Sequence, residues 1–102
     1  MDYENVFYAL DGRWLLLKTY YILNEEFALD SAARAFKMYL LRNKTIATYT
    51  KQQYTQLIIL LQKIALIPLK NPVYAQNLRE SIEKKTIVAD KKWLLMQVDL
   101  LA

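Results

Sequence analysis

Few residues of this chain could do chemistry, because its 102 residues include no cysteine and no histidine. Thiol and imidazole groups supply most zinc sites, thiol nucleophiles, disulfides and the commonest general base. Among the ten acidic residues, the one close pair that is flanked by apolar sequence is Glu25–Glu26. Its position at an expected turn favours a helix start over acid–base catalysis. We therefore expect no catalytic residue, no metal and no cofactor, and we do not expect an enzyme.

Basic side chains are the second chemically capable group, and they are distributed unevenly. Residues 1–30 carry six acidic and two basic residues, whereas residues 31–79 carry eight basic residues and no acidic ones. The most compact basic cluster consists of Arg34, Lys37, Arg42 and Lys44. We predict this cluster as the candidate interaction surface, for an acidic partner or for phosphates. The competing interpretation is a solvated face with favourable charge at a helix C-terminus.

The composition indicates which elements must position these side chains. With one glycine and two prolines, the chain has too little turn chemistry for an all-β fold, while helix-forming residues are plentiful. A content of 55% hydrophobic residues is too high for a disordered chain. The length fits one domain over residues 1–102. We predict an all-α protein of about five helices, arranged as antiparallel helix pairs or as a compact bundle.

Apolar spacing and capping signals place these helices along the chain. The first is expected over about 11–24 and the second over about 26–43. The third begins near Thr48 or Thr50 and stops at Pro68, because a residue before proline is pushed out of helical geometry. Asn71 and Pro72 are typical of a cap and a first helical position, so a fourth helix begins there. Asp90 is expected to cap the last helix.

The first expected helix is apolar over most of its circumference. One stripe is formed by Leu10, Trp14, Leu17 and Tyr21. Beside it lies a second stripe of Leu16, Tyr20 and Leu23. A helix of this kind is expected to be covered on more than one side. We therefore predict a central position for it, and we expect the aromatic residues Trp14, Tyr21 and Phe36 to lie in the core.

Part of this pattern resembles a known helical repeat. Trp14, Leu17 and Tyr21 reproduce the W-x2-L-x3-Y spacing that opens a tetratricopeptide repeat, and Ala32 with Phe36 reproduces the A-x3-F step of its second helix. Lys18 replaces the usual glycine, and Ala32 comes two residues later than the family interval. The resemblance implies two antiparallel helices packed through these residues. The stretch 15–44, with KKWLLMQV near the end, is also similar to the C-terminal part of uncharacterised bacterial helical-repeat proteins.

Two functional hypotheses follow from these observations. The leading one is a non-catalytic protein-interaction or scaffold domain, alone or as a piece of a longer repeat array, that binds a helix or extended segment in a groove between helices. Its partners would be another protein, neighbouring repeats or a second copy of the chain, because apolar side chains exceed what one small core can hide. The alternative is a small basic nucleic-acid-binding or regulatory protein. Scattered bases without a recognition motif make nucleic acid the less favoured partner.

The sequence also bears on membranes and on cellular location. Its longest apolar run is residues 57–61, far short of the ~20 residues that cross a bilayer. The N-terminal stretch MDYENVFYAL carries acidic residues where a secretory signal has basic ones. We therefore expect no membrane partner and a cytoplasmic location.

Overall fold

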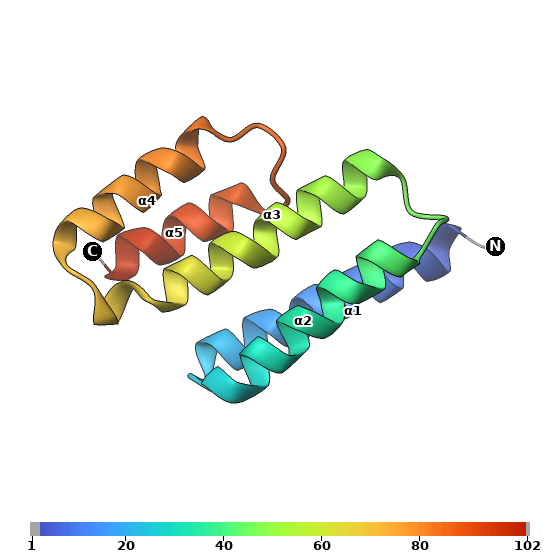
Figure 1. The fold of residues 1–102 in the computed structure, drawn as a ribbon, viewed down its shortest axis with the longest axis horizontal. Helices are drawn as coiled ribbons and strands as arrows, with labels where there is room; N and C mark the ends of the chain where they lie inside the picture. The colour runs from blue at the N-terminus through green and yellow to red at the C-terminus, as the bar shows by residue number, and fades with distance from the viewer. Residues whose placement is uncertain (1–2, 102) are drawn as a thin grey trace. The chain divides into compact units, whose positions relative to one another are not determined.

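Five α-helices and one short 3₁₀ helix, η1, make up the protein in a computed structural model that describes residues 3–101 and the side chains of residues 6–101 (Figure 1). Their bounds are α1 Tyr3–Ile22, α2 Glu26–Arg42, α3 Thr48–Ala65, η1 Ile67–Leu69, α4 Pro72–Lys84 and α5 Lys91–Leu101. The described residues form no β-strand. The predicted all-α class with about five helices is confirmed.

The chain divides into two compact units after residue 47. Unit 1 ends at Ala47 and contains α1 and α2, and unit 2 begins at Thr48 and contains α3, η1, α4 and α5. Helices within each unit are close neighbours in the sequence. The single domain expected over residues 1–102 stays a prediction.

Helix α1 begins at Tyr3, eight residues before the expected start at Asp11. The expected start was wrong because the residues before Asp11, from Tyr3 onward, are also helical. A glycine in a helix interior costs about 1 kcal/mol relative to alanine. Leu10 is completely buried one turn before Trp14, so burial of the residues on both sides of Gly12 outweighs that cost.

A tight turn at Asn24 reverses the chain between α1 and α2. Asn24 has a φ of 57°, the left-handed conformation that its position after the first helix predicts. The next amide, of Glu25, donates a hydrogen bond of 2.9 Å to the carbonyl of Tyr20, which satisfies one end of α1. α1 and α2 consequently run antiparallel and lie side by side (Figure 1).

The core of unit 1 is the seam between α1 and α2. α1 buries Leu10, Trp14 and Leu17, while α2 buries Leu29, Ala33, Phe36 and Leu40. The prediction that Trp14 and Phe36 are core residues is confirmed. Tyr21 is half-buried, and this burial raises the pKa of its hydroxyl above the usual value.

The second predicted stripe of α1 has a different environment. Leu16 and Leu23 are exposed, and Tyr20 is half-buried. The expectation that α1 is covered on more than one side was therefore wrong for these leucines. The physical reason is that α2 is the one other helix among the described residues of unit 1, and a single helix covers a single face of its neighbour.

Unit 2 packs α5 alongside both α3 and α4 (Figure 1). α3 provides the largest share of the core of unit 2. Its buried residues are Leu57, Ile58, Leu60, Leu61 and Ile64. The predicted start of α4 is confirmed, because the side-chain oxygen of Asn71 accepts a 3.1 Å hydrogen bond from the amide of Tyr74 and Pro72 is the first helical residue. α3 ends at Ala65, and Pro68 lies within η1.

Polar contacts join the ends of α4 and α5. The Nζ atom of Lys91 donates to the carbonyls of Glu83 at 2.6 Å and Lys85 at 2.8 Å, which places a positive charge at the C-terminus of α4. Arg79 of α4 pairs with Asp99 of α5 at 2.7 Å and also with Glu83. The hydrogen bond from the Arg79 guanidinium is the main cause that holds the pKa of Asp99 below its usual value.

Helix α5 buries only part of its apolar residues. Leu94 and Val98 are fully buried and Trp93 is half-buried, whereas Met96 and Leu101 are exposed. Asp90 precedes α5 with a φ of 51°, a left-handed conformation. No described helix is both long enough and apolar enough to cross a membrane.

Candidate interaction site

Two of the four basic residues of the predicted cluster line one pocket. Arg42 is the last residue of α2 and Lys44 lies two residues beyond it, and both line one pocket of unit 1. Arg34 is exposed and Lys37 is half-buried on α2, and neither lines that pocket. On an ideal helix Lys37 and Arg42 point about 140° apart, which explains the separation.

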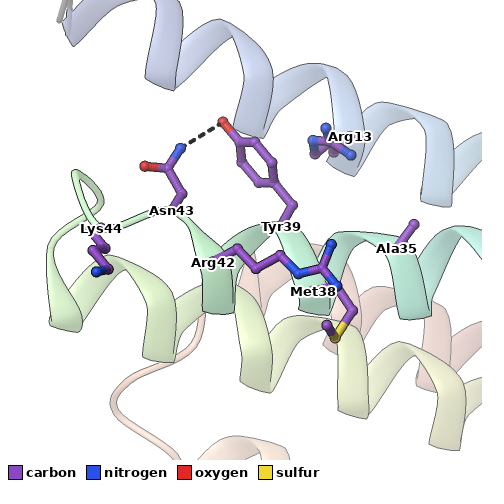
Figure 2. A pocket seen from close by; sticks show the side chains of 7 residues that line it. All are labelled: Arg13, Ala35, Met38, Tyr39, Arg42, Asn43 and Lys44. Carbon is purple, nitrogen blue, oxygen red and sulfur yellow. Dashed lines mark hydrogen bonds between the residues drawn. The ribbon is translucent and has the colours of Figure 1, made fainter.

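The pocket at the end of the helix pair takes its third basic side chain from α1 (Figure 2). It is open to solvent and has a volume of about 720 Å³. Its lining consists of Arg13, Ala35, Met38, Tyr39, Arg42, Asn43 and Lys44. Ala35, Met38 and the ring of Tyr39 are its apolar part, and the three basic residues are its charged part.

The sequence reasoning missed Arg13, although a signal for it was present. Arg13 precedes the Asn24 turn by as many residues as Ala35 follows it, since 24 − 13 and 35 − 24 are both 11. In an antiparallel helix pair, residues at equal distance from the turn lie opposite each other. Arg13 and Ala35 accordingly line the same pocket. Counting back from the turn would have placed Arg13 beside the α2 cluster.

Tyr39 is the centre of the polar contacts in this pocket. The guanidinium carbon of Arg13 lies 3.9 Å from the centre of the Tyr39 ring, a cation–π contact. The Nδ2 atom of Asn43 donates to the Tyr39 hydroxyl at 3.3 Å (Figure 2). The Oδ1 atom of Asn43 accepts from the amide of Thr45 at 3.1 Å and from its hydroxyl at 2.6 Å. Asn43 is thus held from both sides and fixes the position of the Tyr39 hydroxyl.

A second surface of unit 1 lies on α1, and we name it the α1 outer face. Its exposed apolar side chains are Tyr8, Leu15, Leu16, Ile22 and Leu23. Tyr8, Leu15 and Ile22 recur every seven residues, so they lie nearly in line along the helix. Their exposed fractions are 71%, 63% and 63%. α1 therefore presents an apolar stripe to solvent as well as one to α2.

Two small residues, Gly12 and Thr19, lie within the α1 outer face. The Thr19 hydroxyl donates to the carbonyl of Leu15 at 2.8 Å, so its donor is satisfied inside the helix. A Cβ atom built on Gly12 would meet no described atom within 4 Å. Packing within the described chain therefore does not require a glycine at that position.

The described residues contain no group of three His, Cys, Asp or Glu side chains that could hold a metal ion. Comparison with protein-family models, with curated proteins and with solved structures finds no match for this chain. The pocket and the α1 outer face are therefore the two candidate binding surfaces of unit 1.

Proposed function

We propose that this protein is a non-catalytic protein-interaction domain and that α1 binds a helix of the partner along its outer face. The observation that carries the proposal is the apolar stripe that α1 leaves exposed in addition to its buried one. Exposed apolar residues gathered on one face are typical of protein–protein contacts. A partner helix with its own stripe at seven-residue spacing would match Tyr8, Leu15 and Ile22.

Gly12 supports a helix as the occupant of this face. Glycine lets two helix backbones approach closely, because it has no side chain to hold them apart. Its cost to α1 would be offset by contact with the partner. The resemblance to a tetratricopeptide repeat points the same way, since such repeats bury their outer faces against neighbouring helices. A second copy of α1 is itself a helix with this stripe, so self-association tests the face directly.

Self-association should depend on Leu15. We expect the average mass in sedimentation equilibrium to rise above the 12.1 kDa of the monomer as the concentration increases. Leu15→Glu should keep the chain monomeric, because a charge in the centre of the stripe would have to lose its hydration on pairing. Leu41→Glu is the matched control, since Leu41 is 72% exposed on α2 and should associate like the parent. A strict monomer at every concentration, or equal behaviour of both variants, would contradict the proposal.

Gly12→Leu should separate folding from association. Leucine has the higher helix propensity and open space around it, so we expect the monomer to gain about 0.5–1 kcal/mol of unfolding free energy. The same side chain would keep a partner helix away, so self-association should weaken. Urea denaturation at low concentration and sedimentation at high concentration measure the two effects. Destabilisation, or unchanged association, would show that Gly12 has a different role.

The alternative of nucleic-acid binding stays a prediction. Of the four basic residues proposed for phosphates, Arg42 and Lys44 share a pocket with Arg13, while Arg34 and Lys37 lie outside it. A phosphate contact needs several bases along one track. The arrangement therefore favours a compact acidic ligand over a strand of nucleic acid.

A further inference from the structure

We infer that the pocket lined by Arg13, Arg42 and Lys44 binds an acidic segment of a protein. This site is distinct from the α1 outer face, since Arg13 points about 160° away from Leu15 on an ideal helix. The inference adds the chemical class of a ligand to the proposed interaction domain. It does not depend on pairing of α1 with another helix.

The pocket offers charged hydrogen-bond donors whose charge is not neutralised within the described chain. None of its seven lining residues is acidic. Arg13, Arg42 and Lys44 have no ion-pair partner among the side chains that the structure describes. Arginine and lysine side chains donate hydrogen bonds and accept none. An anionic ligand is the class that this surface can satisfy.

The uncharged polar side chains of the pocket also favour a ligand that accepts hydrogen bonds. The Tyr39 hydroxyl oxygen already accepts from Asn43, so its own proton is directed elsewhere and can be donated to a ligand. The side-chain Oδ1 atom of Asn43 already accepts hydrogen bonds from the amide and the hydroxyl of Thr45. Tyr39 also stacks beneath the Arg13 guanidinium, which restrains that side chain before any ligand arrives.

Size and position favour carboxylates on a peptide over a single phosphate group. A volume of about 720 Å³ holds several side chains, whereas one phosphate needs donors converging on a single point. Arg42 and Lys44 stand at the C-terminus of α2, where the helix dipole is negative, so binding of any anion here depends on the positive side chains and not on the helix end. The apolar side chains of the pocket, Ala35 and Met38, suit a peptide in which an apolar residue lies between two acidic residues.

The test uses the full chain and short capped peptides. The probe is Glu-Glu-Leu-Glu-Glu-Leu-Glu, and its control peptide carries Gln at every Glu position. Binding is measured by NMR titration at about 50 mM and about 150 mM salt, because exposed ion pairs weaken with screening. The pocket variant is Arg42→Gln with Lys44→Gln. The matched variant is Arg34→Gln with Lys37→Gln, which removes the same two charge types from α2 outside the pocket.

We expect the Glu peptide to shift the resonances of Tyr39 and Asn43, and the Gln peptide to leave them unchanged. The pocket variant should weaken binding about tenfold, and the matched variant less than about threefold, because each exposed charge contributes modestly. Tyr39→Phe should weaken binding a few fold while it keeps the ring beneath Arg13. Unchanged far-ultraviolet circular dichroism confirms that each variant is folded.

Three results would overturn the inference: equal weakening by both charge variants, no binding of the Glu peptide at the lower salt, or tighter pocket-dependent binding of inorganic phosphate or a single-stranded oligonucleotide. Leu15→Glu separates this site from the α1 outer face. It should abolish self-association and leave peptide binding unchanged, so the failure of one site is distinguishable from the failure of the other.

Discussion

Trp14→Ala should cost about 3–5 kcal/mol of unfolding free energy, the range for truncating a buried large aromatic residue. Trp14 is 8% exposed in the seam of α1 and α2, where the described part of unit 1 offers no third helix to refill the space. Its ring also lies 5.1 Å from the Nζ atom of Lys18, so the substitution removes a cation–π contact as well. Against a total stability of roughly 5–15 kcal/mol, this loss leaves unit 1 unfolded or close to it.

Thermal and urea denaturation followed by circular dichroism measure this loss. The control is Leu15→Ala, because Leu15 is the next residue of α1 and is largely exposed. We expect a change within about 0.5 kcal/mol for it. Trp14→Phe should lie between the two, since it restores part of the buried area. A midpoint for Trp14→Ala that equals that of the parent would show that Trp14 is not a core residue.

Leu94→Ala should have the second largest effect, about 2–5 kcal/mol. Leu94 is completely buried on α5, the helix that packs against both α3 and α4. Removing its side chain leaves a cavity on the buried face of α5, and the loss of unfolding free energy grows with the cavity volume that cannot collapse. The polar contacts of Arg79 with Asp99 lie on the exposed surface of unit 2 and contribute too little to compensate.

Leu100→Ala is the matched control for this prediction. It makes the same chemical change in the same helix at a residue that is 73% exposed. Urea denaturation should therefore separate the two variants by at least about 1.5 kcal/mol. Equal losses would mean that α5 is not held by Leu94, and a loss in the control alone would mean that the buried face of α5 is the opposite one.

Local features of the sequence were sufficient to predict the helices. The reversal at Asn24, the cap at Asn71 and the start at Pro72 depend on the backbone preferences of single residues and their nearest neighbours. The buried stripe of α2 followed from its 3.6-residue period. The start of α1 was predicted eight residues too late, because the helix continues upstream of Asp11 through the buried Leu10 to Tyr3.

The tertiary structure decided which basic residues share a site. Lys37 points about 140° away from Arg42, and Arg34 lies about two turns earlier on α2, so neither lines the pocket, while Arg13 reaches it from α1. Arg13 and Lys44 line the same pocket because the chain reverses at Asn24 and α1 packs against α2. Side chains from different helices are brought together only by that packing. The exposure of Leu16 was decided in the same way. A residue's apolar character is a property of the sequence, whereas its burial depends on how many neighbouring helices are available to cover it.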